Sequence, residues 1–163
     1  MSRLLATVFG LGLLRPAPGT IASLVAVLAG ALMYRFAGFP ALAVATVGVT
    51  ALGFWAVGRE LAGRPGEDPQ EFVIDEVAGQ WIALLFPAAA FWFRGDDGFL
   101  PYPAPLAAFL FFRLFDIWKP WLVGRADRRD DAAGVMLDDL WAGLFAGVSV
   151  IVAGGVYHLI LFA

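Results

Sequence analysis

Long runs of apolar residues, interrupted by short charged stretches, limit what this chain of 163 residues can fold into. Hydrophobic residues make up 61% of the sequence and charged residues 15%, whereas soluble domains carry about 25% charged residues. A bilayer core is about 30 Å thick, so a membrane-spanning helix needs about 20 mostly apolar residues. The composition therefore indicates an integral membrane protein and argues against a disordered chain or a water-soluble enzyme.

Five segments have the apolar character expected of membrane helices. They cover residues 20–39, 40–58, 72–93, 104–118 and 135–163. The stretch Gly38-Phe39-Pro40 predicts a tight turn between the first two segments. The sequence thus predicts one all-α domain over residues 1–163, a polytopic membrane helix bundle of about five transmembrane helices. Gly143 and Gly147 have the GxxxG spacing that lets a neighbouring helix approach closely.

The N-terminal segment, residues 1–19, has a mixed character. Arg3 followed by the apolar residues 4–14 resembles a signal peptide, but Arg15-Pro16 interrupts the run and no clear cleavage site follows. We expect residues 1–19 to be an uncleaved interfacial or re-entrant segment. A signal peptide is the alternative.

Basic residues are concentrated in alternate connecting regions, which predicts the orientation of the chain through the positive-inside bias. Eight basic residues fall in the regions predicted to be cytoplasmic: Arg3, Arg15, Arg59, Arg64, Lys119, Arg125, Arg128 and Arg129. The N-terminus is therefore predicted to lie in the cytoplasm and the C-terminus outside. Of the 25 charged residues, 21 map to the cytoplasmic side or the first helical turns beneath it; the exceptions are Arg35, Arg94, Asp96 and Asp97.

Acidic residues lie at the ends of three predicted helices, all near the cytoplasmic interface. They are Asp75 and Glu76, Asp116, and Asp138 and Asp139. Ionisable residues within membrane segments usually face the bundle interior and mark function, because a charge is costly in hydrocarbon. Arg113 and Lys119 lie three residues on either side of Asp116, so all three share one helical face. The alternative is that the acids are solvated in the headgroup region and simply end the helices.

A cluster of five acids and two bases would repel itself without a counterion. Mg²⁺ prefers carboxylate and water oxygens and is often shared with a substrate phosphate, so a bound divalent cation would resolve the repulsion. A second feature lies on the same side: Gly19-Thr20 at a helix start, with Ser23 after it, presents free N–H groups and hydroxyls suited to an anion. Most such helix starts are plain N-caps.

Several kinds of chemistry are excluded. Cysteine is absent, which excludes disulfides, thiolate metal sites and a cysteine nucleophile. His158 is the single histidine, too few for two-histidine chemistry, and its predicted position is on the far side. The net charge of −3 does not support nucleic-acid binding.

Four stretches of the chain resemble motifs of the phosphatidylglycerophosphatase A family, in the family's order. They read Gly19-Thr20-x-x-Ser23, Val73-Ile74-Asp75-Glu76-Val77-x-Gly79-Gln80-Trp81, Arg113-x-Phe115-Asp116-Ile117-Trp118-Lys119-Pro120 and Gly134-Val135-Met136-Leu137-Asp138-Asp139-x-x-Ala142-Gly143. The resemblance implies a helical, Mg²⁺-dependent phosphatase of the bacterial inner membrane. It would hydrolyse phosphatidylglycerophosphate to phosphatidylglycerol and phosphate. The chain departs from the family pattern at Ala22, Leu122 and Asp131-Ala132.

The residues and the resemblance together suggest a role for each side chain. Asp75, Glu76, Asp138 and Asp139 would hold one or two Mg²⁺ ions, which bind phosphate oxygens and acidify a coordinated water. Arg113 and Lys119 would bind the phosphate, and Asp116 would orient them or accept the proton of the water. Gly19, Thr20 and Ser23 would help to bind the headgroup. A carboxylate nucleophile is the alternative to an activated water.

A small membrane transporter or ion-binding protein with an acidic cytoplasmic vestibule is the alternative function. A transport path should place ionisable residues across the membrane. Here they gather on one side, which favours chemistry on a lipid headgroup, with the active site facing the cytoplasm.

Overall fold

The computed structural model describes residues 1–62, 69–96, 98–129 and 131–162, which are mostly helical and contain no strand. Its elements in order are α1 (Ser2–Ala6), η1 (Leu11–Leu13), α2 (Pro18–Glu60), α3 (Ile74–Trp92), α4 (Ala104–Trp118), α5 (Leu122–Asp127) and α6 (Ala132–Phe162). The predicted all-α class is confirmed. Arg64 and Asp97, which the orientation argument used, lie outside the described residues.

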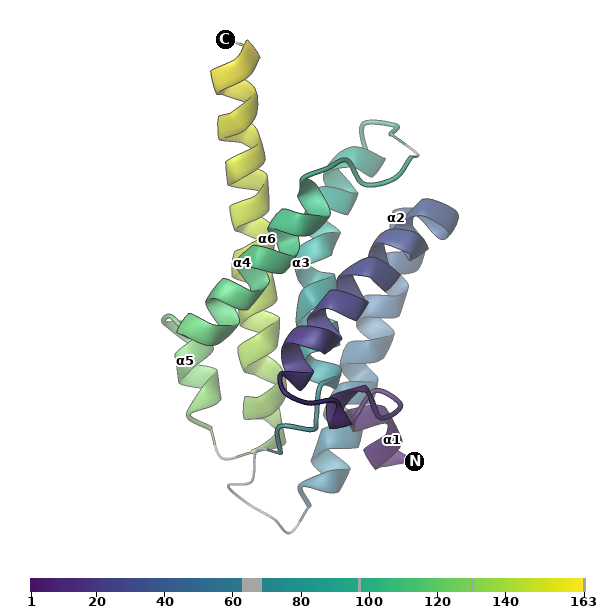
Figure 1. The fold of residues 1–163 in the computed structure, drawn as a ribbon, viewed down its shortest axis with the longest axis vertical. Coiled ribbons are helices and arrows are strands. Elements are labelled where there is room, and N and C mark those ends of the chain that lie inside the picture. The colour runs from purple at the N-terminus through teal and green to yellow at the C-terminus, as the bar shows by residue number, and fades with distance from the viewer. Residues whose placement is uncertain (63–68, 97, 130, 163) are drawn as a thin grey trace.

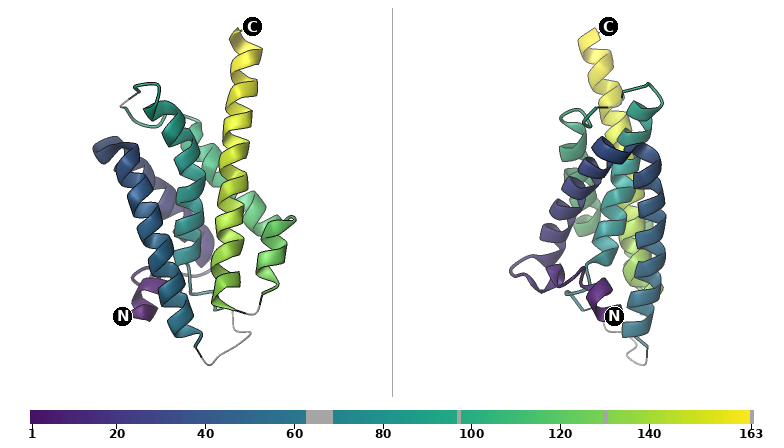
Figure 2. Two further views of the ribbon diagram at one scale, coloured as in Figure 1. Left: turned by 180° about the vertical axis from the view of Figure 1, so that it is seen from behind. Right: turned by 90° about the vertical axis from the view of Figure 1, so that its right-hand side faces the viewer.

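The first two predicted segments form a single element, α2, that changes direction at Gly38. Gly38 has φ 75° and ψ 178°, a backbone conformation that glycine adopts without steric cost, and it separates arms 18–37 and 39–60. The two arms meet at the end of the bundle opposite α1 (Figures 1 and 2). A Cβ on Gly38 would lie 2.5 Å from the Trp92 ring, so the end of α3 packs against this reversal. The predicted turn is confirmed.

The remaining predicted segments correspond to α3, α4 and α6, and α4 has the predicted bounds. Three described helices are long and apolar enough to cross a membrane: α2, α3 and the Ala132–Ile160 part of α6. The 15 residues of α4 extend about 22 Å, less than the bilayer core. A membrane helix bundle is therefore confirmed, whereas the count of five spanning helices is not.

The N-terminal segment packs against the bundle at the end where α3 begins. Ala6 is buried in an apolar cluster with Ala56, Val57 and Phe72, and its carbonyl accepts a hydrogen bond from the Val73 N–H at 2.9 Å. Whether residues 1–19 are interfacial or re-entrant stays a prediction. The charged run 125–131 begins inside α5, which packs on α6 and buries Val123 in the same apolar cluster as Ala142 and Ala146.

The central helix is α3, which contacts α2, α4 and α6, while α4 crosses obliquely over α3 and α6 (Figure 1). Small residues let α3 and α6 approach closely. A Cβ on Gly79 would lie 2.4 Å from the Asp139 carbonyl oxygen, and a Cβ on Gly147 would lie 2.1 Å from the Phe86 ring. The predicted close approach at the GxxxG spacing is confirmed, and it brings the first turns of α3 and α6 together.

Candidate active site

An open cavity of about 380 Å³ lies where α2, α3 and α6 begin and α4 ends. Nine of the ten predicted site residues line it: Gly19, Thr20, Asp75, Glu76, Arg113, Asp116, Lys119, Asp138 and Asp139. They come from four helices that are far apart in the sequence. The structure therefore brings the predicted residues into one place.

Ser23 is the predicted site residue that does not line the cavity. It is fully buried one turn further along α2, and its hydroxyl donates a hydrogen bond to the Gly19 carbonyl at 2.8 Å. The Ser23 Oγ also accepts a hydrogen bond from Arg113 Nη1 at 3.4 Å. Ser23 thus contacts the site through Arg113, a residue that lines the cavity.

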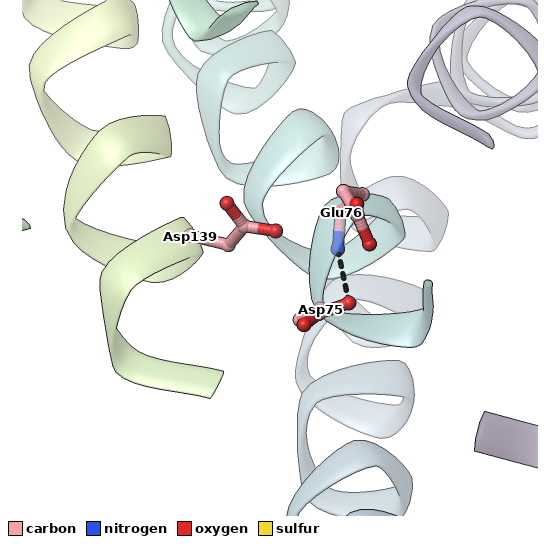
Figure 3. A group of neighbouring side chains, drawn as sticks. All are labelled: Asp75, Glu76 and Asp139. Carbon is pink, nitrogen blue, oxygen red and sulfur yellow. Dashed lines mark hydrogen bonds between the residues drawn. The ribbon is translucent and has the colours of Figure 1, made fainter. Parts of the chain in front are cut away.

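Three carboxylates form the most compact acidic group of the described residues. Asp75 and Glu76 from α3 and Asp139 from α6 each offer an oxygen, and these oxygens lie within 4.8 Å of one another (Figure 3). The backbone N–H of Glu76 donates to Asp75 Oδ1 at 3.0 Å. Asp75 is 7% exposed and Asp139 only 3%. The three carboxylates therefore meet in a region with little solvent to screen charge.

The donor set of this group fits a hard divalent cation. Glu76 Oε2 and Asp139 Oδ1 are buried and have no hydrogen-bond partner among the described residues. Carboxylate oxygens that lack N–H or O–H donors are the ligands that Mg²⁺ and Ca²⁺ prefer. Asp116 adds a further negative charge that acts on both Glu76 and Asp139. The arrangement is thus suited to binding a cation among carboxylates.

Asp138 has different partners from its neighbour Asp139. Its Oδ2 accepts a hydrogen bond from Lys119 Nζ at 3.0 Å, and its Oδ1 accepts one from the Asp139 backbone N–H at 2.9 Å. The structure therefore divides the four predicted metal ligands into a group of three and a fourth that is tied to a lysine.

Lys119 ends α4 in a left-handed backbone conformation, with φ 50° and ψ 53°. Its ammonium pairs with two carboxylates, those of Asp127 on α5 and Asp138 on α6. Burial lowers the pKa of Lys119, but the hydrogen bonds and negative charges of Asp127 and Asp138 outweigh burial and raise the pKa above its ordinary value. Lys119 is therefore charged throughout the physiological pH range.

Arg113 and Asp116 form a second ion pair on the inner face of α4. Arg113 Nη1 lies 2.6 Å from Asp116 Oδ2, and both side chains are less than a fifth exposed. The start of α2 lies against this pair, since a Cβ on Gly19 would come within 2.1 Å of Glu76 Oε1 and 3.5 Å of Arg113 Nη1. The positive end of the α2 dipole thus faces the Glu76 carboxylate, an arrangement that stabilises the negative charge.

Several cavity residues were not predicted from the sequence, namely Gln70, Asp127, Arg129 and Asp131. Arg129 pairs with Asp131 through two contacts of 3.0 and 2.7 Å, and the Gly134 N–H donates to Asp131 Oδ1 at 2.8 Å. The Arg129 hydrogen bond and the Gly134 N–H lower the pKa of Asp131 to about 2. The available signal was the charged run 125–131 directly before the Asp138-Asp139 pair.

Comparison with known proteins adds independent findings. A sequence model of the phosphatidylglycerophosphatase A family matches residues 4–154. A relative from Haemophilus influenzae named phosphatidylglycerophosphatase A is 32% identical over 148 residues, covering 90% of this chain and 85% of the relative. The Escherichia coli protein of the same name is 31% identical over 144 residues, covering 88% and 77%.

A third relative carries a different name. A Bacteroides thetaiotaomicron protein, whose name provisionally assigns it as a phosphatidylinositol-3-phosphatase, is 36% identical over 154 residues, covering 92% of this chain and 91% of the relative. No solved structure matches the chain significantly.

Proposed function

This chain belongs to the phosphatidylglycerophosphatase A family, and on that premise we propose that it is a lipid phosphatase that hydrolyses phosphatidylglycerophosphate to phosphatidylglycerol and phosphate. The observation that carries the proposal is the cavity, in which carboxylates from α3 and α6 face an arginine and a lysine from α4. A phosphomonoester needs positive charge around its oxygens. The arginine and the lysine supply such charge directly, and the carboxylates could supply it by holding a divalent cation. The apolar helices that surround the cavity suit a substrate whose acyl chains stay in the bilayer.

The cations of the site are the groups suited to the phosphate. Arg113 presents a planar guanidinium from one side of the cavity, and Asp116 holds it through a 2.6 Å ion pair. Lys119 offers an ammonium from the end of the same helix, between Asp127 and Asp138. Both cations are held in place before the substrate arrives, so little reorganisation is needed when negative charge develops on the phosphate in the transition state.

Asp75, Glu76 and Asp139 are the residues that would hold Mg²⁺, because their oxygens are mutual neighbours and two of them are buried without a donor among the described residues. A bound Mg²⁺ would supply positive charge to the phosphate oxygens and acidify water. Asp138 adjoins this group and links it to Lys119.

Hydrolysis forms a bond between a water oxygen and phosphorus and breaks the bond between phosphorus and the glycerol oxygen. Asp116 lines the cavity between the arginine and the acidic group, so its carboxylate is suited to accept the proton that the water loses and to pass a proton to the leaving glycerol oxygen. A carboxylate that attacks phosphorus directly remains the alternative nucleophile.

We further propose that the protein lies in the bacterial inner membrane with the cavity toward the cytoplasm. The bias of basic residues toward alternate connecting regions supports this orientation. Labelling of single engineered cysteines with an impermeant reagent tests it. A cysteine at Glu60, the last residue of α2, should react from the cytoplasmic side only; reaction from the outside would reverse the orientation.

Phosphate release from the purified protein in detergent tests the activity. We expect release from phosphatidylglycerophosphate that depends on Mg²⁺ and stops with a chelator. No metal-dependent release would refute the proposal. Phosphatidylinositol-3-phosphate belongs in the same assay, because one relative is named for that substrate. A larger kcat/KM on the inositol lipid would identify that lipid as the preferred substrate. The assignment of the cavity as the phosphatase site would still stand.

A further inference from the structure

Gln80, in the middle of α3, is a polar residue that the proposed chemistry does not use. Its side chain is fully buried, and neither its Nε2 nor its Oε1 has a hydrogen-bond partner among the described residues. Burial of an amide without partners costs stability, and buried polar groups in folded proteins almost always find a partner. The position of Gln80 therefore calls for a partner.

Gln80 lies directly beneath the acidic group. It is one helical turn beyond Glu76, so the two side chains share a face of α3. Two contacts of neighbouring residues fix the position of Gln80 along α2. Gly19 lies against Glu76 at the cavity, and deeper in the bundle Trp81 Nε1 donates a hydrogen bond of 2.8 Å to the Ala26 carbonyl. Gln80 thus lies at the depth of Ser23 on α2.

A second helix contributes a polar side chain to this layer. Arg113 of α4 reaches α2 there and donates to Ser23 Oγ at 3.4 Å. Its Nε is buried and has no hydrogen-bond partner in the part of the chain that the structure describes. Glu76 Oε2 is likewise buried without a hydrogen-bond partner among the described residues, and a carboxylate oxygen that ligates a cation keeps a lone pair that can accept a hydrogen bond from water. Two helices, α3 and α4, therefore carry buried polar atoms without partners among the described residues, and both pack against α2.

The unpartnered atoms include both hydrogen-bond donors and acceptors, which is the combination that a water molecule can satisfy. Arg113 Nε and Gln80 Nε2 are donors, whereas Glu76 Oε2 and Gln80 Oε1 are acceptors. Water accepts two hydrogen bonds and donates two, and internal waters typically make about three bonds to such groups. We propose that Gln80, Arg113 and Glu76 bind one or two internal water molecules beneath the cavity. Through this water, Gln80 is a positioning residue that orients the Arg113 guanidinium and the Glu76 carboxylate.

The positioning role rests on the proposed function, whereas the water site does not. We would record NMR spectra of the protein in detergent micelles with ¹⁵N-labelled arginine and look for a cross-peak between water and the Arg113 Nε–H, assigned by its loss in Arg113→Lys. We expect a long-lived water at this proton. Gln80→Met keeps the volume of the side chain and removes both amide atoms, so the cross-peak should disappear. Leu84→Met, one turn further on the same face, should retain it.

Activity provides the second readout. Loss of a group that supports catalytic or metal-binding side chains typically lowers activity by about tenfold or more, so we expect that loss in kcat/KM for Gln80→Met. Its unfolding temperature should not fall, because the substitution removes an amide that has no direct partner. If Gln80 only fills space, Gln80→Met would match Leu84→Met in kcat/KM, which would overturn the positioning role.

The outcomes separate the two proposals. If the wild type is active but shows no cross-peak, the water site is contradicted and the proposed function stands. The same holds if the cross-peak persists in Gln80→Met. An inactive wild-type protein with a Gln80-dependent cross-peak contradicts the proposed function and retains the water site.

Discussion

Gly143 of α6 lies against the backbone of Gly79 of α3, where a Cβ on Gly143 would be 2.2 Å from the Gly79 carbonyl oxygen. The two helices can approach this closely because neither residue has a side chain. The contact lies one turn above the acidic group, whose members come from these same two helices. The spacing of the carboxylates therefore depends on the spacing of the glycines.

Gly143→Ala is expected to push α6 away from α3. Overpacking of a tight contact costs about 1–3 kcal/mol, and the displacement of Asp139 from Asp75 should also lower turnover. Denaturant unfolding and phosphate release measure the two effects. Gly154→Ala is the matched control, since a Cβ at this position of α6 meets nothing within 4 Å. Equal stability and activity of the two variants would contradict the role of the contact.

Asp139→Asn and Asp138→Asn should have different effects although the residues are adjacent. Asp139 belongs to the group of three carboxylates, so its amide variant should weaken Mg²⁺ binding, measured by titration calorimetry in detergent. Asp138 pairs with Lys119, so Asp138→Asn should lower turnover and leave Mg²⁺ affinity close to that of the wild type. The reverse pattern would show that Asp138 is the ligand and Asp139 is not.

Gly19→Ala should disturb the site from the side of α2. The added Cβ would lie 2.1 Å from Glu76 Oε1, so the carboxylate must move. We expect weaker Mg²⁺ activation with little loss of stability, because the cavity is open on that side. Gly48→Ala, on the same helix with nothing within 4 Å, should keep full activity and gain up to about 1 kcal/mol from its better helix propensity. Normal Mg²⁺ activation of Gly19→Ala would rule out this contact.

Asp131→Asn should reveal a pH-dependent contribution to stability. The folded protein holds the pKa of Asp131 at about 2, below its ordinary value of 3.8, through Arg129 and the Gly134 N–H. A depressed carboxyl pKa stabilises the fold above the ordinary value, and this stabilisation is lost as the pH falls toward 2.

The difference in unfolding temperature between the wild type and Asp131→Asn should therefore be largest near neutral pH and fall to zero below pH 2. Asparagine can still accept the Gly134 N–H, so the difference reports the charge paired with Arg129. Added salt should reduce it, because both side chains are about half exposed. A difference that does not change with pH would contradict the assignment.

The depth of the site was predictable from the sequence. A charged residue is costly inside hydrocarbon, so an acid in an apolar helix is kept near its end: Asp75 and Asp116 lie in the terminal turns of α3 and α4, and Asp138 lies in the second turn of α6. The bounds of α4, the turn at Gly38 and the face shared by Arg113 and Asp116 followed from local patterns as well. Each depends on residues that are neighbours in the chain.

The pairing of groups across helices was decided by the tertiary structure. Adjacent residues on a helix point about 100° apart, so the rotation of α6 directs Asp139 to the α3 carboxylates and Asp138 to Lys119. The sequence could not distinguish these two acids. The contact of Asp127 with Lys119 depends on how α4 and α5 pack, and the burial of Gln80 depends on how α3 packs against its neighbours. Apolar patterning determines which residues reach this end of the bundle, whereas helix rotation and the glycine contact between α3 and α6 determine which of them meet.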